Sequence, residues 1–281
     1  MTPSHDSHGA DATRAALSAA WSAMHAAHPL VLCITNRVTP QRVADTLLAA
    51  GASPVMADNP AEVAQMAAIA SAVYLNTGLH ETQVASFEAA MTAMATGGKT
   101  VVLDPVGAGA TAYRTERIHA LRHGIAFSAI RGNASEIRAL AGEAAGARGV
   151  DSADSADAAL NAALALAVSD HTVVAVSGER DLITDGRQVA RIGGGHEWLT
   201  RITGSGCALG ALTAACIAAT DPWIGALVAH AAFALATDRA LPHSTGPGTL
   251  SIALLDALCA LEPADFAHAD ITVTAVVGAM A

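Results

Sequence analysis

The stretch TGSGCAL at residues 203–209 places two glycines directly before a long apolar segment with the composition of a helix. The first backbone N–H groups of a helix have no partners within it, and they point outward at the positive end of the helix dipole. Gly204, Ser205 and Gly206 are therefore predicted to form an anion-binding loop suited to a phosphoryl group. Cys207 opens the helix beside that anion, where the thiolate is favoured, so it is a candidate catalytic residue. A tight glycine turn before a packed helix explains the same residues without any ligand.

The composition favours a helix-rich enzyme that acts on a small molecule. The chain has 281 residues, enough for one large α/β domain, and 52% of them are hydrophobic although only 3% are aromatic. The excess is mostly alanine, which favours close-packed helices over a β-sandwich. A formal net charge of −10 without a basic cluster argues against nucleic acid as a partner. The four scattered cysteines form no CxxC pair, which argues against zinc and disulfides and favours the reducing cytoplasm.

The sequence carries no signal for a membrane. Residues 1–12 are polar and lack the cationic start and apolar core of a signal peptide. Residues 1–20 are expected to be a flexible or helical extension. The longest apolar runs, around 207–219 and 223–236, are separated by Asp221-Pro222 and are too short to cross a bilayer. We therefore expect both runs to be buried helices of a soluble protein, and we find no convincing domain boundary.

Short apolar runs alternate with helical patterns along most of the chain. The strands are predicted at residues 28–35, 72–76, 100–103, 125–130 and 172–176, and the helices at 40–50, 60–70, 81–95, from 135, and at 154–169. Asp185-Gly186 between two further short runs, 182–184 and 188–192, is a strong hairpin signal. From residue 206 onward the chain is predicted to be nearly all helix. This alternation is typical of an α/β fold with a mostly parallel central sheet and helices on both faces.

Ligands of such sheets bind beyond the carboxyl ends of the parallel strands, and polar residues stand at these positions. Asp104 ends the strand 100–103, where its carboxylate could hold Mg²⁺ or the water molecules around it. The following proline also makes Asp104 the natural start of a simple turn. Ser177 follows the strand 172–176, in a loop that either contacts a nucleotide or only leads into the hairpin.

The segment after the run 125–130 has two interpretations. Asn133 and Glu136 have the spacing of a capping box, which explains both residues without any function. The functional interpretation places Glu136 near a metal ion and Arg131 near a nucleotide phosphate, for which a planar guanidinium is well suited. The local sequence does not separate the two.

Taken in order, these segments resemble the hydroxyethylthiazole kinases of the ribokinase-like superfamily. The sharpest element is TGSGC, because most ribokinase-like kinases carry aspartate as the catalytic base where this chain has Cys207. The resemblance covers about residues 30 to 260. The matching stretches are NRVT at 36–39, GASPVM at 51–56, DPVGAGAT at 104–111, RGNASEI at 131–137, SGERDLITDG at 177–186, TGSGC at 203–207 and GPGT at 246–249.

The resemblance implies a single ribokinase-like domain that phosphorylates the primary alcohol of 4-methyl-5-(2-hydroxyethyl)thiazole, with ATP as co-substrate and Mg²⁺ as cofactor, in thiamin salvage. It also implies a homotrimer with the thiazole site between neighbouring subunits. Ser177 stands where the family more often has threonine, and the hydroxyl is retained. The resemblance assigns the thiazole to Asn36, Val38, Met56 and Gly204, ATP to Arg131 and Ser177, the metal and phosphates to Asp104 and Glu136, and the position nearest the substrate hydroxyl to Cys207.

Three other functions remain open on the sequence. A related kinase of a vitamin alcohol, hydroxymethylpyrimidine or pyridoxal, would share the fold, and aspartate in place of Cys207 would favour it. A cysteine hydrolase would use Cys207 as a covalent nucleophile and would need a histidine in contact, yet no histidine lies in the converging motifs. A non-catalytic module would bind ATP and show no turnover with any alcohol.

Overall fold

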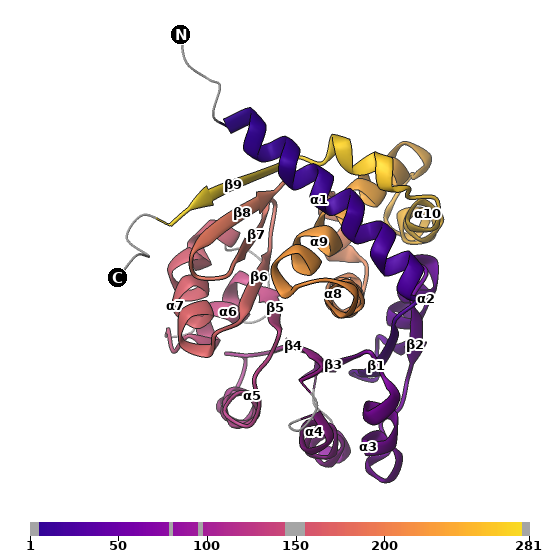
Figure 1. Cartoon of the computed structure of the whole chain (residues 1–281). Helices are drawn as coiled ribbons and strands as arrows, with labels where there is room; N and C mark the ends of the chain where they lie inside the picture. Colours follow the sequence, from indigo (N-terminus) through magenta and orange to yellow (C-terminus); the bar gives the residue numbers. More distant parts are fainter. Residues whose placement is uncertain (1–5, 79–80, 95–97, 144–154, 277–281) are drawn as a thin grey trace.

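A computed structural model of the chain describes residues 6–78, 81–94, 98–143 and 155–276. The described strands form one sheet in the order β2-β1-β3-β4-β5-β6-β7-β8-β9 (Figure 1). The pairs from β2 to β6 are parallel, and the pairs from β6 to β9 are antiparallel. The sheet is therefore mostly parallel, as predicted. The strands are β1 (Leu30–Ile34), β2 (Ser53–Val55), β3 (Ala72–Asn76), β4 (Thr100–Asp104), β5 (Ala129–Asn133), β6 (Val173–Ser177), β7 (Asp181–Thr184), β8 (Gln188–Ile192) and β9 (Ile271–Ala275).

Helices cover both faces of the sheet, because alternate residues of the central strands point to opposite sides. In β1, Val31 and Cys33 pack into one buried cluster, whereas Leu32 and Ile34 pack into the other. One face carries α1 (Asp6–Ala27), α2 (Pro40–Ala49), α8 (Ser205–Ala219), α9 (Pro222–Ala240) and α10 (Pro247–Cys259). The other face carries α3 (Pro60–Ile69), α4 (Glu81–Met94), α5 (Ala112–Arg122), α6 (Ala134–Leu140) and α7 (Leu160–Asp170).

The two ends of the described chain pack together. The segment that was expected to be an N-terminal extension is helical from Asp6, as α1, and its Trp21 is fully buried. The Trp21 indole donates to the backbone oxygen of Leu261 at 3.1 Å and lies against Phe266, with 5.6 Å between the ring centroids. Phe266 belongs to the short 3₁₀ helix η4 (Pro263–His268), which leads into β9. Helix α1 is thus part of the main core.

Three sequence predictions about these elements are wrong. Strand β5 is Ala129–Asn133 and not 125–130, because pairing with β6 continues to Asn133 and Ser177, while Phe127 is used for packing before the strand begins. The region 154–169 begins, in its described part, with the 3₁₀ helix η1 (Ala156–Ala159) ahead of α7. The C-terminal part is not all helical, since β9 adds an edge strand beside β8.

Helix α9 also corrects the sequence prediction about length. Together with the 3₁₀ turn η3 (Leu241–His243) it spans Pro222–His243, which is long and apolar enough to cross a membrane by length and composition. However, 67% of the apolar 18-residue stretch within this span is buried inside the fold. This burial is what we expect of a core helix, and α9 packs against both α8 and α10.

Candidate functional site

The predicted site residues gather where the parallel strands end. Asn76 and Asp104 are register partners at the ends of β3 and β4, and Asn133 and Ser177 are partners at the ends of β5 and β6. The N-terminus of α8 faces this edge of the sheet, because an added Cβ on its Gly206 would lie 2.8 Å from Nη1 of Arg131 in β5. The sheet and one helix end therefore form the site together, as expected for an open α/β fold.

The predicted anion loop is confirmed as a helix start, and its glycines are also required by packing. Gly204 is the N-cap of α8 with φ +80°, a left-handed conformation that glycine adopts readily. A Cβ at Gly204 would lie 2.6 Å from Cγ2 of Thr39. Ser205 donates from its hydroxyl towards the backbone oxygens of Leu199 and Ile202, at 2.7 and 3.0 Å. The backbone N–H groups of the first turn, together with Arg131, therefore supply the positive end of this site.

Asp104 is fully buried and only partly satisfied. Its Oδ2 accepts hydrogen bonds from the Tyr74 hydroxyl at 2.6 Å and the Asn76 amide at 2.9 Å. Its Oδ1 has no hydrogen-bond partner among the described residues. Burial raises the pKa of Asp104, and the nearby charge of Arg131 opposes that shift. A buried carboxylate oxygen without a hydrogen-bond partner costs free energy, so we expect a ligand to bind at Asp104 Oδ1.

Glu136 forms the predicted capping box, and its carboxyl group is buried near Asp104. The capping box is present, since Asn133 Oδ1 accepts from the Glu136 N–H at 2.9 Å and Glu136 Oε2 accepts from the Asn133 N–H at 3.0 Å. Its Oε1 accepts from the Gly107 N–H at 3.0 Å. Burial, followed by the charge of Asp104, raises the pKa of Glu136 to about 7. The cap thus also brings a second buried carboxyl group close to Asp104.

Cys207 does not have the thiolate character that its place at a helix start predicts. Burial first, and then the charge of Asp104, raise the pKa of the Cys207 thiol to about 11. The Asn76 amide donates to Sγ at 3.2 Å, and the Asn36 amide lies 3.6 Å from it. These contacts place the thiol among amides and not beside a histidine, among the described residues, so a cysteine hydrolase lacks the base that it would need.

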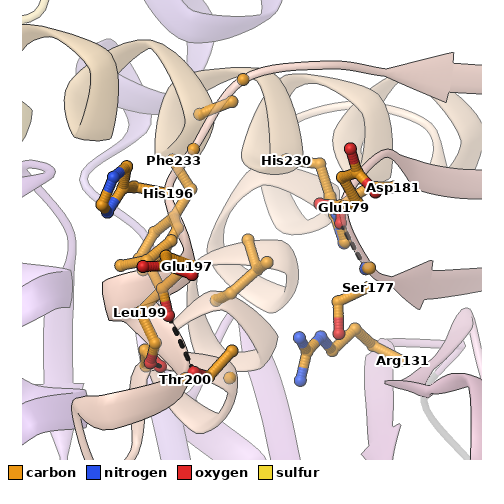
Figure 2. Close-up of a pocket in the computed structure, with 17 residues that line it drawn as sticks. Arg131, Ser177, Glu179, Asp181, His196, Glu197, Leu199, Thr200, His230 and Phe233 are labelled. Atoms are coloured by element: carbon orange, nitrogen blue, oxygen red, sulfur yellow. Dashed lines mark hydrogen bonds and ion pairs between the residues drawn. The ribbon is translucent and has the colours of Figure 1, made fainter. Parts of the chain in front are cut away.

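A pocket of about 660 Å³ opens beside the anion loop. Figure 2 shows Arg131 and Ser177 on one side of it and His196 and Glu197 on the opposite side. The side chain of His230, from α9, also lines it. This volume is in the range of small-molecule and cofactor sites. No role was predicted for His196 or His230 from the sequence.

Other predicted residues lie outside this pocket. Val38 follows β1 and is 75% exposed, and Met56 follows the edge strand β2 and is 39% exposed. Asn36, in contrast, is close to Cys207 and donates to Asn76 Oδ1 at 3.0 Å. The described residues contain no group of three or more acidic, cysteine or histidine side chains that could hold a metal by themselves.

Asn76 was missed by the sequence analysis although a signal was present. It is the last residue of the strand 72–76, which was predicted with the correct bounds. Asp104 was chosen as a candidate because it stands at the same end of the next strand. Tyr74 gives no such signal, because an aromatic residue inside a buried strand is typical of a core.

Sequence comparisons match most of this chain to one family of proteins. The sequence model of the hydroxyethylthiazole kinase family matches residues 21–264. The hydroxyethylthiazole kinase of Clavibacter sepedonicus is 47% identical over 240 residues, which cover 84% of this chain and 86% of that protein. The enzyme of the same name from Klebsiella pneumoniae strain 342 is 45% identical over 236 residues, covering 84% and 91%.

Solved structures give the same result. The hydroxyethylthiazole kinase structure from Pyrococcus horikoshii OT3 matches with a TM-score of 0.84 and 34% identity, over 92% of this chain and 98% of that one. The Staphylococcus aureus pyridoxal kinase in complex with AMP-PCP matches with a TM-score of 0.60 and 15% identity, over 88% and 98%. The second likeness shows the ribokinase-like fold alone.

Proposed function

The chain belongs to the hydroxyethylthiazole kinase family and is a kinase, and we propose that it transfers a phosphoryl group from ATP to the primary alcohol of 4-methyl-5-(2-hydroxyethyl)thiazole, with Mg²⁺, in thiamin salvage. We further propose that the whole chain acts as one kinase domain, since the core includes α1 as well as β9. Its cysteines are free thiols, in keeping with a place in the cytoplasm.

One juxtaposition carries this proposal. The Arg131 guanidinium lies against the first turn of α8, and the buried carboxyl groups of Asp104 and Glu136 lie beside it. A positive region binds phosphate oxygens, and a neighbouring pair of carboxylates attracts a divalent cation. The phosphates of ATP with Mg²⁺ require both kinds of group at once. Ser177 lines the same pocket as Arg131 and is proposed to contact the nucleotide.

The carboxyl groups fit Mg²⁺. Asp104 would hold the ion through Oδ1, the buried oxygen without a partner among the described residues, and phosphate oxygens would complete the coordination. Glu136 already accepts two backbone hydrogen bonds, so it would act from the outer shell through water. When bound, the ion would offset the charge of the triphosphate. It would also remove the repulsion between the two carboxylates that helps to raise the pKa of Glu136.

Cys207 would orient the alcohol rather than attack it. Two asparagine amides, from Asn36 and Asn76, hold Sγ in place. The raised pKa keeps the thiol protonated at neutral pH. Phosphoryl transfer passes through a loose transition state in which the alcohol loses its proton late, so a strong base is not required. The backbone N–H groups at Gly204 and Gly206 would bind the phosphoryl oxygens during transfer, whereas the Ser205 N–H already donates to the Ile202 oxygen at 3.3 Å.

The thiazole would bind at Asn36, Val38, Met56 and Gly204, between subunits of a homotrimer. This proposal is supported by exposed apolar side chains on this side of the molecule. Besides Val38 and Met56, Leu48 of α2 and Ile252 of α10 are exposed, and α2 packs against α10. Light scattering at micromolar concentration should give three times the mass of the 28.1 kDa chain. A monomeric mass would contradict the trimer and the shared thiazole site.

The reaction is tested with a panel of alcohols. Purified protein with ATP and Mg²⁺ is offered the hydroxyethylthiazole, hydroxymethylpyrimidine and pyridoxal, and the products are identified by mass spectrometry. We expect the thiazole phosphate to form fastest. Phosphorylation of the pyrimidine or pyridoxal with none of the thiazole would overturn the substrate assignment, and ATP binding without any product would identify a non-catalytic module.

A further inference from the structure

The turn between β6 and β7 is held from inside the molecule by a histidine of α9. His230 is fully buried, and its Nδ1 lies 2.6 Å from Asp181 Oδ2. The second carboxylate oxygen, Asp181 Oδ1, accepts from the Gly178 N–H at 3.0 Å. Because a carboxylate can only accept, Nδ1 carries the proton in this pair. One carboxylate therefore connects α9 to the residue that directly follows Ser177.

The same turn is attached on its outer side by a weaker contact. Arg180 makes two hydrogen bonds with the carboxylate of Asp270, at 2.8 and 3.1 Å. Both side chains are about half exposed, and exposed ion pairs contribute little to stability. The buried link through His230 is screened far less by water. We therefore expect it to determine the position of the turn.

His230 is the polar one of the three α9 residues that line the pocket. The other two, Phe233 and Ala234, are apolar. Its Nε2 is buried and has no hydrogen-bond partner among the described residues. An apolar side chain would fill this position without leaving a polar atom unpaired. The other ring nitrogen, which binds Asp181, is thus the feature that explains a histidine here (Figure 2).

We propose that His230 is a positioning residue for the nucleotide, acting through Asp181 on the Gly178 N–H and thereby on the loop that carries Ser177. This inference rests on the proposed nucleotide site. Cys207 takes its hydrogen bonds from Asn36 and Asn76, on another part of the sheet edge. Loss of the histidine link should therefore weaken ATP binding while the thiazole site and the transfer step are retained.

Two substitutions of His230 test the roles of its two ring nitrogens separately. His230→Asn places an amide donor where Nδ1 was and removes Nε2, whereas His230→Leu has similar bulk and no donor. The matched control is Thr237→Val, which also removes a buried hydrogen bond from α9, to the Phe233 oxygen, at a position outside the pocket. Calorimetric Kd values for a non-hydrolysable ATP analogue with Mg²⁺ are compared with steady-state constants for both substrates.

We expect His230→Leu to raise the Kd of the analogue and the KM for ATP about tenfold, as for a lost hydrogen bond to a buried charge. The KM for the thiazole and kcat should stay within about twofold of wild type. His230→Asn should restore most of the affinity, and Thr237→Val should leave it unchanged. Amide hydrogen exchange of the segment 177–181 should become faster in His230→Leu alone.

Two results would contradict the inference about His230. Unchanged analogue affinity in a folded His230→Leu protein overturns the inference, and so does an equal rise in KM for both substrates, which indicates a merely structural role. If His230→Leu does not fold, Asp181→Asn tests the same link from its partly exposed end and should raise the KM for ATP selectively. If wild type binds no nucleotide, the proposed function itself fails, and this inference fails with it.

Discussion

The side-chain amide of Asn76 donates a hydrogen bond to Sγ of Cys207 at 3.2 Å. The same amide nitrogen lies 2.9 Å from Oδ2 of Asp104, so one group spans the thiol and the buried carboxylate. This arrangement fixes the positions of two side chains: Cys207, which is proposed to orient the substrate alcohol, and Asp104, which is proposed to bind the metal ion.

Asn76→Leu should impair catalysis more than binding. Leucine has similar bulk but no donor, so Asp104 and Cys207 each lose a partner while the core remains filled. We expect kcat to fall about 100-fold, at the lower end of the range for removal of one positioned hydrogen-bond donor. Steady-state kinetics with both substrates will measure this. Asn161→Ala, at an exposed position on α7, is the control and should behave as wild type; a normal kcat in Asn76→Leu would contradict the role.

Cys207→Ala should be slowed by up to about 100-fold and remain measurable, because the alcohol loses a group that orients it, while the loose transition state needs no strong base. The thiol pKa of about 11 adds a pH prediction. Between pH 7 and 9 the folded protein keeps this group protonated, so the kcat profiles of wild type and Cys207→Ala should run parallel. A wild-type rate that rises tenfold per pH unit, in contrast to the variant, would indicate a reactive thiolate. Cys207→Asp should retain activity.

Glu136 should make the metal-free protein less stable as pH rises. Its pKa is raised from 4.5 to about 7 in the folded state, so the folded state binds more protons than the unfolded state between these values. Stability is therefore fully present below the lower value and is lost as pH rises through the upper one. With EDTA present, Tm should fall between pH 5 and 8 by a few degrees more in wild type than in Glu136→Gln.

Addition of Mg²⁺ should raise Tm more at pH 8 than at pH 6, because the metal ion competes with protons for the carboxylates. Asp104 shifts in the same direction and should leave a residual slope in Glu136→Gln. Equal pH profiles for wild type and variant would contradict the prediction.

Gly206→Ala should weaken ATP binding without weakening the fold. The new Cβ would lie 2.8 Å from Nη1 of Arg131 and displace the guanidinium, so we expect the KM for ATP to rise about tenfold. Alanine is favoured over glycine in a helix, which limits any loss of stability. Gly248→Ala is the matched control, since Gly248 occupies the same position in the first turn of α10 and an added Cβ there meets nothing within 4 Å. Equal KM values in the two variants would show that Arg131 is not sensitive to this contact.

The sequence predicts the parallel strands β1, β3, β4 and β6 well, because their signals are local, whereas the three-residue edge strand β2 was not predicted. The run AVYLN is strand β3 with the predicted bounds, and Asn133 and Glu136 form the predicted capping box. The hairpin at Asp185-Gly186 is confirmed as well. Strand β9 was missed although Ile271–Ala275 begins with four β-branched residues that alternate between apolar and polar, since the neighbouring helices dominated that part of the chain. The bounds of β5 depend on its partner β6, which is a non-local contact.

The site residues also divide into those with a local sequence signal and those without one. Asp104, Arg131 and Ser177 could be nominated from their places after strands. The protonation state of Cys207 could not be predicted from the sequence, because its pKa depends on burial and on Asp104, which lies far away in the sequence. His230 has no local signal at all, since its partner Asp181 is 49 residues away.

The contact of Trp21 with Leu261 and Phe266 has a consequence for the order of synthesis. Helix α1 is translated long before the segment around η4 that covers part of its buried face. Leu17, Trp21 and Met24 must therefore stay partly exposed, or be held by a chaperone, until that segment has been made. A chain truncated after residue 260 should bind a hydrophobic dye that the full chain excludes.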